Sequence, residues 1–143
     1  MSRKGSAVER VLTDTGALLA LFETRDQYHA RARVAAETVR STGGLFVSTT
    51  AILTELSNLL LIRHGPERTA RALGVLFADP TYQWVDVGLD LAKESVRNWL
   101  ERFSDQRFTL TDAISFEVMR RNGITHAFSF DQRFVKAGFS LLD

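Results

Sequence analysis

Short apolar blocks alternate along the chain with longer amphipathic stretches, and the two kinds of block predict strands and helices in turn. The predicted strands are residues 9–13, 45–48, 82–87, 125–130 and 139–142. The predicted helices, in which apolar residues recur at helical spacing, are residues 15–21, 26–40, 51–63, 66–77, 90–103 and 112–122. This alternation is typical of a parallel sheet covered by helices. We therefore expect an α/β, Rossmann-like fold of three layers, with about five short parallel strands and helices on both faces.

Several helix ends carry specific sequence signals. Thr109 and Asp112 have the spacing of a capping box, which places an acid in the first turn of helix 112–122. Gly123 follows that helix and favours the left-handed conformation of a C-cap. Asp26 is expected to cap helix 26–40. The pair Gly65-Pro66 predicts that one helix ends there and that another begins.

Composition bounds the class of protein. The chain has 143 residues, of which 45% are hydrophobic, so residues 8–143 are expected to form one domain with its own core, preceded by a loose tail of residues 1–7. No apolar run has the length of a transmembrane helix, and no signal segment is evident. The absence of cysteine excludes disulfides and thiolate metal sites. We expect a cytoplasmic protein without membrane contact.

Four acids are predicted to meet at one edge of the sheet. Asp14 and Asp131 each follow a predicted strand, and Asp112 begins a helix. Ligands of parallel sheets bind beyond the carboxyl ends of the strands, where these three side chains would converge. Glu55 borders the apolar stripe of helix 51–63, so we expect it to be half-buried and directed toward the protein.

Such a group of acids favours metal chemistry. Adjacent carboxylates repel one another unless a cation neutralises them, and a set of oxygen ligands selects Mg²⁺ or Mn²⁺. These ions activate water and stabilise the leaving oxygen in phosphodiester cleavage, with one acid available as a general base. Setting four acids aside as ligands leaves 18 basic residues against 13 acidic ones. Arg25, Arg107 and Arg133 lie in predicted loops near the site and are candidates for RNA phosphate contacts.

Three of the acids also have a local structural interpretation. Asp14 can cap the helix that follows it, Asp112 can serve only the capping box, and Asp131 can cap the turn 132–136. Glu55 lies in mid-helix, where capping does not apply. The functional interpretation therefore rests on the four acids together and on no single member.

The motifs DTGALLAL, TELSNLL, LTDAISFEVMRRNGI and FSFDQRF, in this order, resemble those of the PIN-domain ribonucleases, in particular VapC-type toxins of toxin–antitoxin pairs. The resemblance spans about residues 11–142. It implies a catalytic quartet that holds Mg²⁺ or Mn²⁺, an RNA substrate, a homodimer and an antitoxin whose tail enters the site. The implied quartet is Asp14, Glu55, Asp112 and Asp131, supported by Ser129 and Asn58. Gly16 replaces a common serine, which leaves Thr15 to supply a hydroxyl near the first acid.

Two other functions remain open. The same fold can serve as a non-catalytic module that binds RNA or a protein partner, and the missing hydroxyl at Gly16 motivates this alternative. A phosphoacceptor signalling domain also combines a five-stranded parallel sheet with acids, and Asp86 would be its acceptor. That class needs an acid pair near the first strand and a lysine after the fifth, and the sequence has neither. We expect the metal-dependent endoribonuclease.

Overall fold

The computed structural model describes residues 9–142 and contains a five-stranded sheet in the order β3-β2-β1-β4-β5, in which every neighbouring pair is parallel. The strands are β1 (Arg10–Thr13), β2 (Leu45–Thr49), β3 (Tyr82–Val85), β4 (His126–Phe128) and β5 (Ser140–Leu141). β1 lies in the middle, where Leu12 is in register with Val47 of β2 and with Ala127 of β4. The strand order reverses between β1 and β4, and this is where an open α/β sheet offers a binding crevice.

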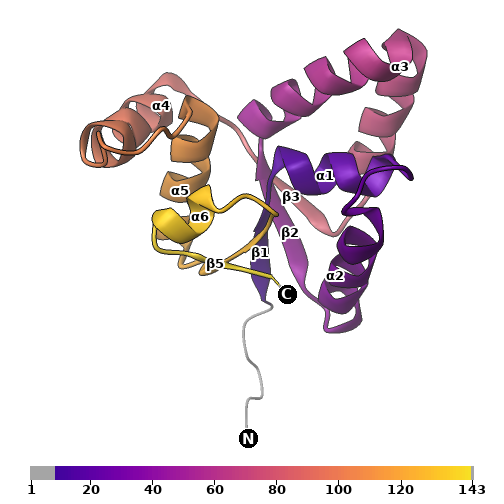
Figure 1. The fold of residues 1–143 in the computed structure, drawn as a ribbon, viewed down its shortest axis with the longest axis horizontal. Coiled ribbons are helices and arrows are strands. Elements are labelled where there is room, and N and C mark those ends of the chain that lie inside the picture. Colours follow the sequence, from indigo (N-terminus) through magenta and orange to yellow (C-terminus); the bar gives the residue numbers. More distant parts are fainter. Residues whose placement is uncertain (1–8, 143) are drawn as a thin grey trace, which may run out of the picture.

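Helices cover both faces of the sheet (Figure 1). On one side lie α1 (Thr15–Phe22), α2 (His29–Ser41) and α3 (Thr50–Ala78), and on the other side lie α4 (Leu89–Ser95), the π-helix η1 (Val96–Glu101), α5 (Leu110–Asn122) and α6 (Arg133–Lys136). The predicted three-layer α/β fold is therefore confirmed. The predicted loose tail of residues 1–7 lies outside the described residues.

The core fills the space between each helical layer and the sheet. Phe46 and Phe128, from strands on either side of β1, are fully buried. On the α5 side, the Phe116 ring contacts Trp99 and Phe108 at centroid distances of 5.2 and 4.9 Å. Each large apolar side chain buried in this way contributes about 1.5–3 kcal/mol. The packing holds α5, which carries Asp112, rigidly against the sheet.

Most predicted helix ends are confirmed. Thr109 and Asp112 form the capping box of α5, and Gly123 adopts a left-handed φ of 65° after it. Gly65 interrupts α3 with a φ of 81°, so the helix bends where Gly65-Pro66 predicted a stop. The cap assigned to Asp26 is wrong, because α2 begins at His29 and Asp26 instead accepts a hydrogen bond from the Tyr28 N–H at 2.8 Å. Asp26 therefore forms an Asx turn with Tyr28, and this turn precedes the first residue of α2.

Several predicted elements differ from the structure in their extent; strand 82–87, for example, is limited to Tyr82–Val85, and strand 139–142 to Ser140–Leu141. The predicted helix 90–103 is an α-helix that passes into the π-helix η1. β4 is shorter than predicted because the chain leaves the sheet at Ser129, whose hydroxyl bonds to Asp14. Across residues 9–142, the length and apolar character that a membrane-crossing helix needs do not occur together in any helix.

Candidate active site

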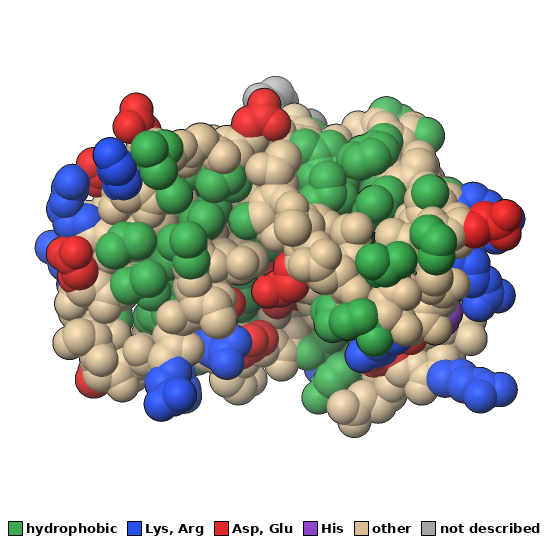
Figure 2. All heavy atoms as spheres, turned by 90° about the horizontal axis from the view of Figure 1, so that it is seen from above, with side chains coloured by type: hydrophobic (Ala, Val, Ile, Leu, Met, Phe, Trp, Pro, Cys, Tyr) green, Lys and Arg blue, Asp and Glu red, His purple; other side chains and the backbone are tan. Residues whose placement is uncertain are grey.

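A cavity of about 500 Å³ opens at the carboxyl ends of β1 and β4. Figure 2 looks down on this end and shows carboxylate side chains around a hollow, with apolar side chains on both sides of it. All four predicted acids line the cavity: Asp14, Glu55, Asp112 and Asp131. A larger cavity, between α1 and the second half of α3, has Glu23 as the single acid in its lining. Because the four predicted acids gather in the smaller cavity, it is the better candidate for the active site.

Asp14 has the most constrained carboxylate of the four. One oxygen accepts from the Ala17 N–H at 3.0 Å and caps α1, so the local interpretation of this residue is also correct. The other oxygen accepts from the Ser129 hydroxyl. Burial raises the pKa of Asp14 to about 6 despite these two hydrogen bonds, and the nearby charges of Asp131 and Asp112 add to the rise. An ionised Asp14 is thus costly in the absence of a cation.

Asp112 and Asp131 share one guanidinium. The Nη1 atom of Arg133 lies 3.5 Å from Asp112 and 3.3 Å from Asp131. Burial raises the pKa of Asp112, against the opposing effects of the Thr109 N–H and of Arg133. The Arg133 N–H also donates to Asp131 at 2.9 Å. Arg133, which the sequence predicts to contact RNA phosphate, pairs with these two acids, because its position two residues after Asp131 folds it back over the turn.

Glu55 is more exposed than predicted. It lines the cavity but is exposed, and among residues 9–142 its carboxylate has no hydrogen bond or ion pair. The apolar stripe of α3 is correctly predicted, since Ile52 and Leu56 are buried. The cavity is open to solvent, so the Glu55 side chain, at the border of this stripe, is exposed to the water in the cavity. Glu55 is the one predicted acid that no protein group holds in place within the described chain.

The predicted supporting residues divide into two groups. Ser129 is buried, donates to Asp14 and accepts from the Asp131 N–H at 3.0 Å, so it joins two of the acids. The Thr15 hydroxyl is buried beside Asp14 and has no hydrogen-bond partner within the described chain. Asn58 and Arg107 are exposed and do not line the cavity. Arg25 lies in the lining of the larger cavity.

The structure adds residues that sequence reasoning missed. Asp26 is a fifth acid in the cavity lining, and Ser115, one turn after Asp112, is buried beside it. The i, i+3 spacing of Asp112 and Ser115 was a signal for the second of these, because it places both on one face of a helix. Nothing in the sequence separates the role of Asp26 from that of an ordinary helix cap.

The residues around the cavity fit a divalent cation in their chemistry, although the side chains as placed do not enclose one. Within residues 9–142, no group of three or more His, Cys, Asp or Glu side chains is arranged to hold a metal ion. The donors are nevertheless all oxygens, which hard cations prefer. The orphaned Thr15 hydroxyl and the raised pKa of Asp14 both mark a place where a cation with its water shell would satisfy groups that the protein leaves unsatisfied.

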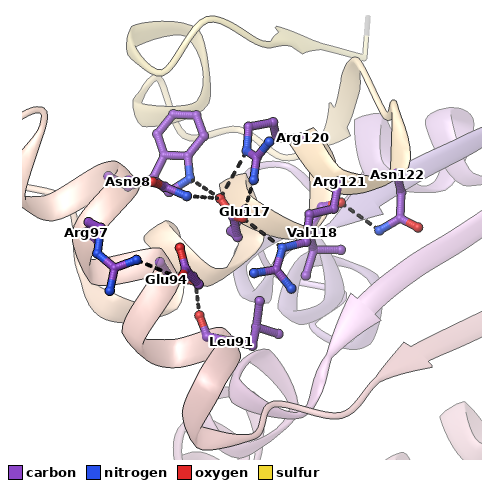
Figure 3. A network of polar contacts seen from close by, with 11 residues as sticks. Leu91, Glu94, Arg97, Asn98, Glu117, Val118, Arg120, Arg121 and Asn122 are labelled. Atoms are coloured by element: carbon purple, nitrogen blue, oxygen red, sulfur yellow. Dashed lines mark hydrogen bonds and ion pairs between the residues drawn. The ribbon is translucent and has the colours of Figure 1, made fainter.

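Asp86 and Glu117 are among the acids that lie outside the cavity. Asp86, the acceptor that a signalling domain would require, is exposed and absent from the lining. Glu117 is fully buried and accepts hydrogen bonds from Trp99, Asn98, Arg120 and Arg121 (Figure 3). These donors hold the pKa of Glu117 down to about 2 although burial opposes them. Glu117 therefore joins α5 to η1 and takes no part in the cavity.

The chain is similar to known proteins in both sequence and structure. A family model for the PIN domain matches residues 11–140. The chain is 31% identical over 129 residues to the 23S rRNA-specific endonuclease VapC20 of Mycobacterium tuberculosis, covering 90% of this chain and 95% of the relative. A crystal structure of that VapC20, described as a Sarcin-Ricin loop cleaving toxin, matches with a TM-score of 0.78 at 28% identity, over 90% of this chain and 95% of the other. VapBC2 from Rickettsia felis, solved with a promoter DNA fragment, shares the fold, with a TM-score of 0.65 at 11% identity over 92% of this chain and 96% of that one.

Proposed function

This chain belongs to the PIN domain family, and we propose that it is a metal-dependent endoribonuclease that acts as the toxin of a toxin–antitoxin pair. The observation that carries the proposal is the convergence of four acids from four separate segments in one cavity at the switch point of the sheet. The 23S rRNA endonuclease among its relatives supports RNA as the substrate class. Residues 8–143 would act as a single nuclease domain.

We assign the ion to Asp14, Asp112, Asp131 and Glu55. The chemistry that a bound Mg²⁺ or Mn²⁺ supplies is neutralisation of the carboxylates, activation of water and stabilisation of the leaving oxygen. The protein itself fixes Asp14 through Ser129 and the Ala17 N–H. Glu55 is free to turn toward the ion, because its carboxylate has no hydrogen bond or ion pair within the described chain.

Arg133 has a second role in this proposal. In the metal-free protein its guanidinium offsets part of the charge of Asp112 and Asp131. A scissile phosphate that enters the cavity offers the same guanidinium a bidentate partner, which is the contact that arginine makes best. When RNA and the ion bind, the Arg133 guanidinium therefore leaves the carboxylates of Asp112 and Asp131 and contacts the phosphate.

The test is cleavage of RNA by the purified chain with Mg²⁺ or Mn²⁺. We expect cleavage to stop with EDTA and to fall by at least about a hundredfold in Asp14→Asn and Asp112→Asn, which keep the shape of the side chain but remove its charge. Asp86→Asn is the matched control, because Asp86 is an exposed aspartate outside the cavity. Equal loss in the control variant, or full activity in EDTA, would remove the basis for this assignment.

The larger cavity, of about 850 Å³, suits a further segment of the antitoxin, in addition to the tail that is expected to enter the active site. Its lining combines the apolar side chains of Leu60 and Val75 with the guanidinium groups of Arg25, Arg68 and Arg71. Charge complementarity favours an acidic amphipathic segment that lays its apolar face on α3. The double variant Arg68→Glu/Arg71→Glu is expected to weaken antitoxin binding in calorimetry by at least about tenfold while cleavage continues.

We also propose a homodimer, which exposed apolar side chains of α3, including Leu61, Ile62 and Phe77, support. Sedimentation of the free chain tests this, with Ile62→Asp expected to yield monomers.

The second candidate function is RNA or partner binding without turnover, which Gly16 favours. A Cβ at Gly16 would lie 3.8 Å from an Asp14 oxygen, an ordinary contact, so a serine fits there. If the wild-type chain binds RNA without cutting it, Gly16→Ser restores the hydroxyl and tests whether its absence is the cause.

A further inference from the structure

One wall of the active-site cavity is aromatic. Tyr28, between α1 and α2, stacks on Phe130, which follows β4, with ring centroids 4.3 Å apart and planes 7° from parallel. Both residues line the cavity together with the acids. Both keep an intermediate exposure, whereas the core rings Phe46, Phe116 and Phe128 are buried. The pair is therefore a surface of the cavity rather than part of the core.

Two amides flank the pair. Gln27 precedes Tyr28 and Gln132 follows Phe130 by two residues, and both line the cavity and are exposed. Among residues 9–142, neither amide side chain makes a hydrogen bond. Arg31 places its guanidinium carbon 5.6 and 5.3 Å from the centroids of the two rings. The wall thus combines an apolar face with two groups that both donate and accept hydrogen bonds, while Arg31 lies near the two rings outside the cavity lining.

The aromatic wall lies next to the proposed chemistry. Phe130 stands between Ser129, which bonds to Asp14, and Asp131. Phe130 is therefore next to Asp131 in the chain and next to the serine that holds Asp14.

Flat ligands with polar edges suit such a wall. RNA-binding proteins stack unpaired bases on aromatic side chains and read the edges of those bases with amides. We propose that Tyr28 and Phe130, with Gln27 and Gln132, form a nucleobase subsite that holds the base of the RNA nucleotide adjoining the bond to be cut. This inference rests on the proposed nuclease function and adds to it a substrate with an unpaired base at the cleavage site.

Fluorescence in EDTA tests the stacking without any need for catalysis. A short single-stranded RNA with 2-aminopurine at successive positions is titrated with the chain, since stacking on an aromatic ring quenches this base. We expect quenching at one position with the wild type, the same quenching with Tyr28→Phe, and its loss in Tyr28→Leu with binding about tenfold weaker. Circular dichroism melts of the three proteins establish that each is folded.

Cleavage products test the reading of the base edge. Sequencing of the ends produced from a randomised RNA pool is expected to show a base preference at the nucleotide beside the cut. Gln27→Ala and Gln132→Ala should flatten that preference and lower kcat/KM for the favoured sequence by about tenfold. Gln83→Ala, an exposed glutamine on β3, is the matched control and should leave both unchanged.

Each outcome has a definite meaning. Quenching that persists in a folded Tyr28→Leu, or a base preference that survives both glutamine variants, overturns the subsite and leaves the aromatic pair as a link between two loops. A wild-type chain that quenches 2-aminopurine but cuts no RNA supports the subsite and contradicts the nuclease function. Cleavage without a base preference or quenching contradicts the subsite alone.

Discussion

Asp14→Asn should make the metal-free protein more stable and at the same time inactive. Burial raises the pKa of Asp14 from 3.8 to about 6. Each pKa unit corresponds to about 1.4 kcal/mol, so ionisation of Asp14 costs up to about 3 kcal/mol of folding free energy. Asp14 keeps partial contact with solvent, which lowers the expected figure to about 1–3 kcal/mol. An asparagine of the same shape carries no such cost.

The pH dependence has a definite sign. Between pH 3.8 and about 6 the folded protein holds a proton on Asp14 that the unfolded chain has released. The wild-type stability attributable to this group therefore falls as pH rises through that window, and the full cost is present above about pH 6. The advantage of Asp14→Asn over the wild type should be near zero below about pH 4 and reach its full size at about pH 7.

Urea denaturation in EDTA, at about pH 4 and about pH 7, measures the difference. With a typical slope of about 1–3 kcal/mol per molar urea, the midpoint of the variant should lie about 1 M higher at neutral pH. Mg²⁺ should then raise the midpoint of the wild type alone, because a ligand stabilises only the state that binds it. A variant that is less stable than the wild type at neutral pH in EDTA would show that Asp14 is a structural group and would refute this reasoning.

Three further predictions concern Glu117, Ser129 and Arg133. Glu117→Gln should cost about 1–2 kcal/mol in denaturation experiments, because its charge-assisted hydrogen bonds to Arg120 and Arg121 are weakened while both guanidinium groups remain about half exposed to water. The stability that the Glu117 carboxylate contributes in the wild type should be lost as pH falls from 4.5 to about 2, since its pKa is lowered in the folded state. Ser129→Ala should weaken Mn²⁺ binding by about tenfold in calorimetry, since Asp14 loses the hydroxyl that orients it. Arg133→Gln should strengthen Mn²⁺ binding several-fold in the same assay, because the cation that competes for Asp112 is removed; unchanged affinity would exclude that competition.

The fold was predictable from the sequence because its signals are local. Apolar periodicity, the Thr109–Asp112 capping box and Gly123 each act within a few residues, and the structure has all of them as predicted. The meeting of Asp14 and Asp131 followed from one topological rule, that the carboxyl ends of parallel strands share an edge.

The remaining site features depend on side chains from separate elements. The pairing of Arg133 with Asp112 joins residues 21 positions apart through a turn that no periodicity describes. The stacking of Tyr28 on Phe130 spans most of the chain. The exposure of Glu55 depends on the width of a hollow between two helical layers, and a helical wheel contains no information about the space outside the helix.

The position of the proposed active site between β1 and β4 also affects how the protein loses activity on heating. Only two residue pairs register β1 with β4, against four between β2 and β3. The segment that begins with β4 carries Ser129 and Asp131. It is thus joined to the central strand β1 by the shorter of the two strand pairings that β1 makes. Local opening of the β1–β4 pairing would separate Asp131 from Asp14 while β1, β2 and β3 stay folded. Thermal inactivation should accordingly precede the global melt, and amide exchange should be fastest in β4 and β5.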